Sequence, residues 1–232
     1  MPGSRLTLSG FRPILAGATA RDRAAACIGA LFVISLTGLV SRWLLGGSSP
    51  LPALMFASIG ASAVLVFAVP ASPLAQPWPV IGGNVISATV GLGVVHLVPD
   101  PMIAAGVAVA AAIAAMTVAR CLHPPGGGTA IIPVLAGVGS NAVDWTFPIA
   151  PVALNAVLLV VGAWLFHRMS GHSYPHRTQA LSSGTLVIED GDIAQALADL
   201  HEPLDVSPAD LKAIATAAAN AAITRQRAKD AK

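Results

Sequence analysis

Charged side chains are scarce in this sequence, and that scarcity decides its class. Asp, Glu, Lys and Arg make up 10% of the 232 residues and apolar residues 55%, whereas charged residues are about 25% of ordinary soluble domains. From Trp43 to Ala119 the only residue ionised at neutral pH is Asp100. A soluble fold of this size could not hide so much apolar surface. The composition therefore predicts a protein that crosses the lipid bilayer several times.

Cysteine is also scarce, since Cys27 and Cys121 are the only two. Two cysteines at the ends of apolar segments make no disulfide framework, and no cluster of ligands suggests a metal. No nucleophile lies beside a recognisable base, so an enzyme is the last class we consider, and we expect no cofactor. The net charge is only +2 and no basic run is present, so we expect no nucleic-acid partner.

Long apolar runs alternate with polar turns along the chain. Because a bilayer needs about 20 apolar residues per helix, the runs predict an all-α, polytopic membrane protein with four full transmembrane helices and two short, broken half-helices. The first run follows two arginines and resembles a signal peptide, but its length and the runs after it favour an uncleaved helix. The four full spans are Ala24–Leu45, Val80–Val98, Met102–Ala119 and Ile149–Phe166.

The polar segments define the expected domains and orientation. Residues 1–23 form an arginine-bearing N-terminal arm, residues 24–168 the transmembrane domain, 169–183 a linker and 184–232 a small helical tail. Basic residues flank the membrane domain at both ends, so the positive-inside rule predicts that both termini are cytoplasmic. The expected location is a plasma membrane, the inner membrane of a bacterium.

The stretch from Arg120 to Ala130 is the most unusual part of the chain. It reads Arg-Cys-Leu-His-Pro-Pro-Gly-Gly-Gly-Thr-Ala. The prolines stop the preceding helix, and the glycines permit positive φ and close approach of a partner. Thr129 is expected to cap the short helix that follows. A broken helix that carries a histidine in an apolar setting is costly, which favours a functional explanation.

A second short element repeats part of this pattern. Gly60-Ala61-Ser62-Ala63 and Gly127-Gly128-Thr129-Ala130 share the order glycine, small residue, hydroxyl residue, alanine. We expect the first stretch, Ser58–Ala63, to interrupt an apolar run so that a half-helix begins near Ser62. Three crossings per repeat would make the two halves inverted, a pattern that points to a midplane binding site in transporters. Four matching residues also arise by chance.

These residues together predict a site for a small anion. Half-helix N-termini and bare glycine backbone offer N–H donors, and no acidic residue lies nearby for a cation path. Arg120 is interpreted first as a positive anchor at a helix end, and Asn155 is equally compatible with a site and with helix contact. His123 is interpreted as functional rather than structural. The candidate binding residues are Ser58, Gly60, Ala61, Ser62, Asn84, Ser87, Arg120, His123, Pro124, Pro125, Gly126, Gly127, Gly128 and Thr129.

The stretch His123–Ala130 resembles the hallmark of the HPP family of integral membrane proteins. Ser58–Leu65, Pro73–Pro77 and Gly82–Ala88 are similar to other shared stretches of that family, in the same order, and the likeness covers roughly residues 20–170. The resemblance implies a multi-span domain often described as four helices. Plant and cyanobacterial members are associated with nitrite transport. Some bacterial members add CBS domains, which we do not expect here.

The sequence and the resemblance together predict a membrane transporter or channel for a small inorganic anion, with nitrite as the first candidate. The anion would bind between Ser62 and Thr129, with His123 pairing it or carrying a coupled proton. The alternative is a membrane-embedded scaffold or sensor that acts through its cytoplasmic tail. A homo-oligomer is plausible because the helices carry small-residue faces.

Overall fold

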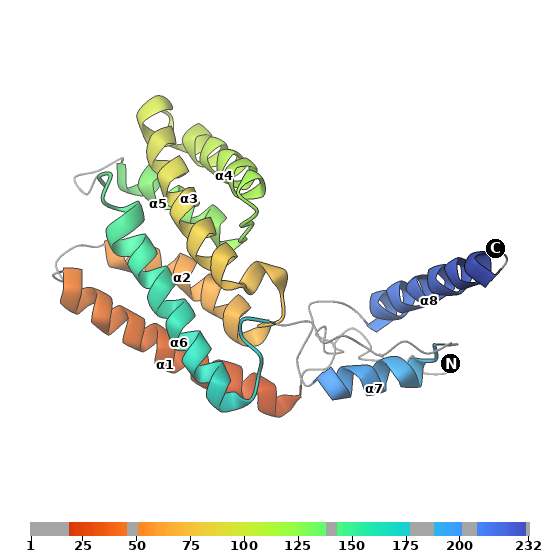
Figure 1. Cartoon of the computed structure of the whole chain (residues 1–232). Helices are drawn as coiled ribbons and strands as arrows, with labels where there is room; N and C mark the ends of the chain where they lie inside the picture. The colour runs from red at the N-terminus through yellow and green to blue at the C-terminus, as the bar shows by residue number, and fades with distance from the viewer. Residues whose placement is uncertain (1–18, 46–50, 138–142, 177–187, 201–207, 231–232) are drawn as a thin grey trace, which may run out of the picture. The chain divides into compact units, whose positions relative to one another are not determined.

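The computed structural model describes residues 19–45, 51–137, 143–176, 188–200 and 208–230. The chain divides into two compact units, Thr19–Thr178 and a second made of Met1–Ala18 with Gln179–Lys232. The described part of the first unit is helical, as predicted (Figure 1). Its elements are α1 (Ala20–Leu45), α2 (Leu51–Ala68), η2 (Pro73–Ala75), α3 (Pro77–Leu97), α4 (Pro101–Val118), α5 (Pro125–Gly137), η3 (Pro148–Ala153) and α6 (Leu154–Ser170).

Four helices in the described residues are long and apolar enough to cross a membrane, which confirms the expected fold class. They are Ala20–Leu44, Pro77–Leu97, Pro101–Val118 and Pro148–Ser170. Three of them begin with a proline, because proline has no N–H to lose in the first turn and its φ is already helical. The helices therefore start a few residues before the apolar runs do.

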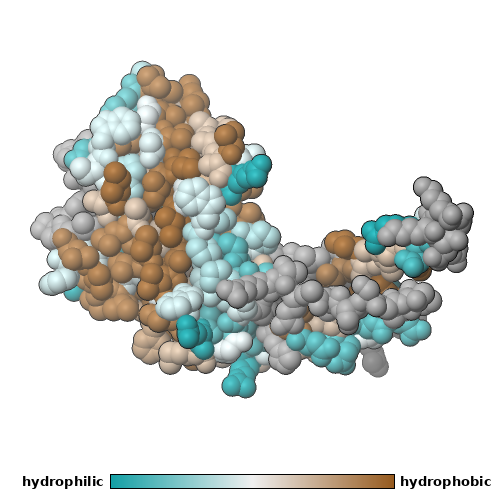
Figure 2. Space-filling view, in the orientation of Figure 1, coloured by the Kyte–Doolittle hydropathy of each residue, from teal (hydrophilic) through white to brown (hydrophobic). Residues whose placement is uncertain are grey.

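The surface of this unit carries apolar side chains outward, as a lipid-facing protein does. In α4 the buried residues Ala104, Ala108 and Ala112 recur every four residues, so small side chains face the neighbouring helices. Larger residues of the same helix, Met102 and Ile103, are exposed. Figure 2 shows such apolar residues over much of the visible face of the helical bundle. Burial in lipid explains why these positions remain hydrophobic.

Helix α3 lies at the centre of the unit. It packs most extensively on α5 and α4, while α1 packs on α2 and α6, and α2 packs on α5 (Figure 1). The contact between α3 and α5 is unusually close: a Cβ built on Gly91 would lie 2.1 Å from the carbonyl oxygen of Ala130. Only glycine permits two helix backbones to approach so closely. This contact holds α5 against the middle of α3.

The expected break in the second apolar run is absent. Helix α2 continues without interruption from Leu51 to Ala68, so the prediction of a half-helix beginning at Gly60 or Ser62 is wrong. Ser62 Oγ lies 3.1 Å from the carbonyl oxygen of Ser58, one helical turn back. A serine whose hydroxyl can bond to the preceding turn is accommodated within a helix. No positive helix end therefore faces the interior from this segment.

The second short helix begins earlier than predicted. Helix α5 starts at Pro125, so Thr129 lies in its second turn and does not cap it. Proline is favourable at the first position of a helix. The next two residues already form backbone hydrogen bonds: the Gly126 N–H donates to His123 O at 2.8 Å and the Gly127 N–H to Pro124 O at 3.0 Å. The three glycines do not adopt the positive φ that glycine permits, because all three are helical.

The second unit contains α7 (Asp190–Leu200) and α8 (Pro208–Asp230). Ile193 and Leu197 of α7 are buried against Leu211 and Ala215 of α8. Lys212 forms an ion pair with Asp190 across the same two helices. The tail thus contains two helices, while the N-terminal arm up to residue 18 lies outside the described residues.

Candidate functional site

Polar side chains from three helices meet at the centre of the apolar unit. Ser58 and Ser62 come from α2, Asn84 from α3 and Thr129 from α5, and His123 lies in the turn that precedes α5. All five are buried. The spacing of the serines places them one turn apart on one face of α2. The structure therefore brings together five of the predicted site residues from separate parts of the sequence.

Asn84 joins α2 to α5. Its Nδ2 donates to the Val80 carbonyl at 2.8 Å and to Ser62 Oγ at 3.3 Å, and its Oδ1 accepts from Thr129 Oγ1 at 2.5 Å. Because a backbone carbonyl only accepts, the bond to Val80 fixes which end of the amide is which. Ser58 Oγ also lies in hydrogen-bond contact with Thr129 Oγ1 and 2.8 Å from the Pro125 carbonyl. These bonds fix the register of the three helices.

His123 closes the network on its other side. Its Nδ1 lies 2.8 Å from the carbonyl oxygen of Leu74 and its Nε2 lies 2.8 Å from Ser62 Oγ. Since the Leu74 carbonyl can only accept, Nδ1 carries the proton, and in the neutral ring Nε2 accepts from Ser62. The imidazole is 0% exposed. One ordered chain of bonds thus runs from Thr129 through Asn84, Ser62 and His123 to the Leu74 backbone.

Two glycines allow close packing between α3 and the segment that carries this histidine. A Cβ on Gly83 would lie 2.6 Å from His123 Cβ, and a Cβ on Gly126 would lie 2.6 Å from Ser87 Oγ. Ser87, the remaining predicted hydroxyl, donates to Met116 Sδ at 3.4 Å and lies outside the chain of bonds. Gly126 is thus required for packing of the turn against α3, and not for an unusual φ.

Of the other predicted residues around the network, only Pro125 is seen to bond to one of its side chains. Pro125 contributes its carbonyl to Ser58. Ala61 and Gly128 are exposed and Gly60 and Gly127 half-buried, and a Cβ on Gly127 or Gly128 would meet nothing closer than 3.8 Å. Pro124 is exposed as well. These positions have room for a larger side chain, so packing alone does not explain their glycines.

Arg120 belongs to the end of α4. Its φ is 54°, and it follows the last helical residues in a left-handed conformation. The N–H of Arg120 donates to Thr117 O at 3.2 Å and that of Cys121 to Met116 O at 2.9 Å, which is the Schellman arrangement usually built on glycine. Arg120 is exposed, and its structural role is therefore to end the helix.

The sequence did not reveal the backbone partners of the site. The carbonyls of Leu74 and Val80 complete the network, yet any residue type could present them. The prolines between Pro70 and Pro79 do indicate a turn there, and this turn brings Leu74 to His123. Asn155 lies apart from the network: its Nδ2 donates to Ser41 Oγ at 3.0 Å and to the Pro151 carbonyl at 2.7 Å, which joins α6 to α1.

The chemistry of the network is that of neutral hydrogen-bonding groups. Three carboxylates lie between residues 19 and 178, at Asp22, Asp100 and Asp144, and the last two are exposed. Within the described residues, no three His, Cys, Asp or Glu side chains are placed to hold a metal ion. Hydroxyls, an amide and an imidazole in an apolar surrounding can orient a small polar ligand or pass a proton.

Residues 16–175 match the transmembrane region of the HPP family. The chain belongs to this family. Two transmembrane proteins of Dictyostelium discoideum are similar to this HPP protein: one is 35% identical over 156 residues, 64% of this chain and 54% of the relative, and the other is 42% identical over 86 residues, 35% of this chain and 28% of the relative. The chain thus spans about half the length of the first relative. No solved structure matches.

The family match includes the whole central network, because it covers α1 to α6 together with the turn that carries His123. Within the stretch that resembles the family hallmark, His123 closes the network and Pro125 starts α5. The chain is accordingly a multi-pass membrane protein in which His123 and Thr129 of this stretch are buried at the junction of α2, α3 and α5.

Proposed function

We propose that this HPP protein transports a small inorganic anion across its membrane, with nitrite as the first candidate. The observation that supports this most is the buried network of neutral hydroxyl, amide and imidazole groups at the junction of α2, α3 and α5. Neutral donors in an apolar interior solvate a weakly hydrated anion without the carboxylates that a cation path requires. Transport as a class fits the family, while nitrite as substrate rests on the resemblance.

The network satisfies its own hydrogen bonds in the described conformation, so an anion would have to displace some of them. Thr129 and Ser62 currently donate to Asn84 Oδ1 and His123 Nε2. Rotation about one side-chain bond would turn either hydroxyl toward a ligand. We propose that the described arrangement is the closed state and that binding substitutes the anion for these protein acceptors.

Helix α5 has the features of a moving element. It has 13 residues, which at 1.5 Å each is about 20 Å, shorter than the roughly 30 Å hydrocarbon core. Pro133 lies inside it, so the Thr129 carbonyl has no N–H four residues on to accept from. A short helix with one missing internal bond can tilt at lower cost than a full span. Tilting α5 would move Thr129 relative to Asn84.

The helix contacts are compatible with two inverted repeats, α1–α3 and α4–α6. Helix α1 packs on α2 as α4 packs on α5, and α1 packs on α6 as α4 packs on α3. Helix α2 and the short, proline-containing helix α5 pack on each other between them. Short or proline-interrupted helices at a repeat interface point to transporter sites. We propose that both termini are cytoplasmic, because basic residues flank the membrane domain at both ends. We propose a bacterial inner membrane as the location.

The proposal is tested by flux into liposomes that contain the purified protein. Nitrite, nitrate, formate and chloride uptake are compared for the wild type and for His123→Ala. We expect selective uptake of nitrite and a loss of about 5- to 150-fold in the variant, since one buried partner contributes about 1–3 kcal/mol. His96→Ala is the matched control, because His96 is exposed at the end of α3 and its loss should leave flux unchanged.

No uptake above that of empty liposomes, from protein shown to be folded, would contradict anion transport. Equal losses in His123→Ala and His96→Ala would contradict the assignment of the site. In the first case the second candidate would lead, a scaffold or sensor acting through its tail. That candidate draws on the separate helical unit of α7 and α8, which has its own small core at Ile193 and Leu197, and truncation after Thr178 would test it.

A further inference from the structure

A short segment after α6 is attached to the loop that holds His123. Helix α6 ends at Gly171, whose φ of 83° turns the chain sharply, a conformation that glycine adopts without cost. The next residues, which we call the strap (Gly171–His176), then run back over the bundle. The strap belongs to the same compact unit as the site.

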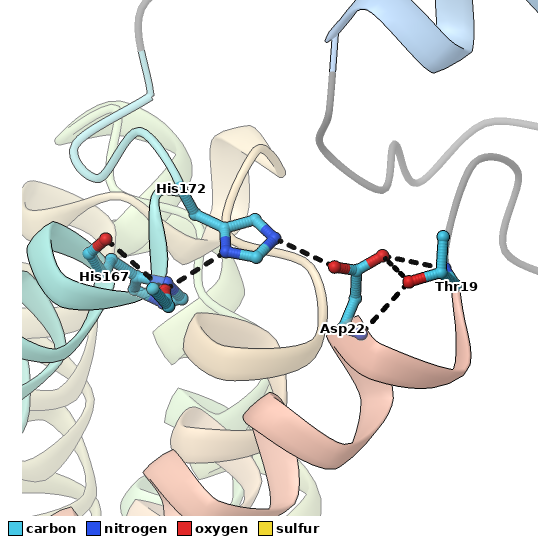
Figure 3. Close-up of polar contacts among 5 residues, drawn as sticks. Thr19, Asp22, His167 and His172 are labelled. Carbon is cyan, nitrogen blue, oxygen red and sulfur yellow. Dashed lines mark hydrogen bonds and ion pairs between the residues drawn. The ribbon is translucent and has the colours of Figure 1, made fainter.

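The strap is anchored to α1 through His172. Its Nε2 lies 3.5 Å from Asp22 Oδ1, and its Nδ1 lies 3.1 Å from Ser170 Oγ. Figure 3 shows the His172 ring between Asp22 at the start of α1 and the end of α6 at His167. Asp22 is itself oriented by Thr19, whose hydroxyl donates to it at 2.6 Å. The strap is thus fixed at its beginning.

The strap then bonds directly to the proline loop (Val69–Gln76). The Tyr174 hydroxyl donates to the Ala75 carbonyl at 3.0 Å, and the His176 N–H donates to Gln76 Oε1 at 2.8 Å. Gln76 in turn donates to the carbonyls of Pro70 and Ser72 at 2.9 and 2.8 Å. Burial raises the pKa of the Tyr174 phenol, so it remains a protonated donor.

The proline loop presents the carbonyl that fixes the tautomer of His123. Leu74 directly precedes Ala75 and Gln76, the two residues that the strap holds, and its oxygen accepts from His123 Nδ1 at 2.8 Å. With the proton on Nδ1, Nε2 can only accept, so the ring offers no N–H toward Ser62 and the network. A bound anion needs donors. The described tautomer therefore opposes anion binding at this position.

A second arrangement of hydrogens is available in which, of the heavy atoms of the network, only the Leu74 carbonyl moves. If the Leu74 carbonyl withdraws, the proton can reside on Nε2 and be donated to Ser62 Oγ at 2.8 Å. The Ser62 hydroxyl then turns to the Ser58 carbonyl, which lies 3.1 Å away. The two arrangements differ in whether His123 accepts or donates at the site, which is a two-state element of the kind that regulation requires.

We propose that the strap restrains the site by holding His123 in its Nδ1–H tautomer, and that release of the strap converts His123 into a donor for the anion. The second half of this statement rests on the proposed transport function. Tyr174 and Gln76 are then positioning residues for His123.

The test is nitrogen NMR of the full chain in lipid nanodiscs with ¹⁵N-labelled histidine, since the ring shifts distinguish the two tautomers. The sequence has six histidines, and the His123 signals are identified by their loss in His123→Gln. Wild type should show the Nδ1–H form. Tyr174→Phe with Gln76→Leu should raise the Nε2–H fraction about tenfold, the effect of one net hydrogen bond, and should speed nitrite uptake several-fold.

Trp78→Phe is the matched control, because it also removes one donor to a backbone carbonyl, that of Ala119 at 3.1 Å. It should leave the His123 tautomer unchanged. An unchanged tautomer in the double variant, or an equal change in the control, would overturn the proposal. If the double variant does not fold, Tyr174→Phe alone is read in the same way. A tautomer shift without any nitrite flux would uphold the strap and contradict the transport function.

Discussion

Replacing Gly91 with alanine should separate α3 from α5. A Cβ at this position would lie 2.1 Å from the Ala130 carbonyl oxygen, 2.9 Å from its carbon and 3.0 Å from its Cα. Ordinary contact begins at 3.4 Å, so the two backbones would have to move apart by about 1.3 Å. Because these are backbone atoms, no side-chain rotation can relieve the clash.

The cost follows from the size of the interface. Overpacking costs about 1–3 kcal/mol and occasionally more, and we expect the upper end here because the closest atom is backbone and α5 packs on α3 along much of its length. Gly93→Ala is the matched control on the same helix, since a Cβ there would meet nothing within 4 Å. It should be neutral or stabilising by up to about 1 kcal/mol through helix propensity.

Thermal unfolding of both variants in detergent, scanned at one rate, measures this difference. A loss of 3 kcal/mol corresponds to a midpoint lowered by about 6–12 °C for a chain of this size. Gly91→Ala should unfold that much earlier than the wild type, and Gly93→Ala at or above the wild-type midpoint. Equal midpoints for the two variants would refute the close crossing of α3 and α5, and with it the position of Thr129 beside Asn84.

Three further substitutions test the turn and the network. Gly126→Ala should lower the unfolding midpoint, because its Cβ would lie 2.6 Å from the nearest atom, while Gly127→Ala should not, because its Cβ would lie 3.8 Å away. If Gly127→Ala folds normally but loses anion flux, Gly127 contacts the anion. Arg120→Gly should raise stability by about 1 kcal/mol in the same scan, since the left-handed conformation is costly for other residues, and a lowered midpoint would contradict this. Thr129→Val should destabilise by about 1–3 kcal/mol by removing the donor to Asn84, whereas Thr89→Val, whose hydroxyl is exposed, should change stability little; equal effects would contradict a buried network.

The break at His123–Gly128 shows where local sequence signals succeed and where they fail. Because no helix continues through Pro124 and Pro125, the sequence predicted a break between α4 and the next helix. The start of the next helix was not predicted correctly, because proline at its first position and glycine in its first turn are compatible with both a loop and a helix. Only the packing of Gly126 against Ser87 and the early bonds to the carbonyls of His123 and Pro124 decide in favour of a helix.

The prediction of a helix break at Ser58–Ala63 was wrong for a related reason. Glycine, serine and alanine in an apolar run resemble a break, because glycine and serine have weak helix propensity. In the bundle, however, both serines have buried partners on other elements, since Ser58 Oγ lies 2.8 Å from the Pro125 carbonyl oxygen and Ser62 Oγ lies 2.8 Å from His123 Nε2. Tertiary contact thus overrides local propensity. Intrinsic preference is measured without such neighbours, so it could not reveal this.

The sequence by itself determined that the chain is a multi-pass helical membrane protein of the HPP type. The scarcity of charge, the length of the apolar runs and the order of the motifs suffice, because a lipid environment leaves helices as almost the only choice for such segments. The same reading identified the hydroxyls, Asn84 and His123. The tertiary structure alone decided that they form one network, that Arg120 ends its helix in a left-handed conformation, and that the carbonyl of Leu74 holds His123. Backbone carbonyls carry no residue signature, and which of them meets a given side chain depends on how the helices pack.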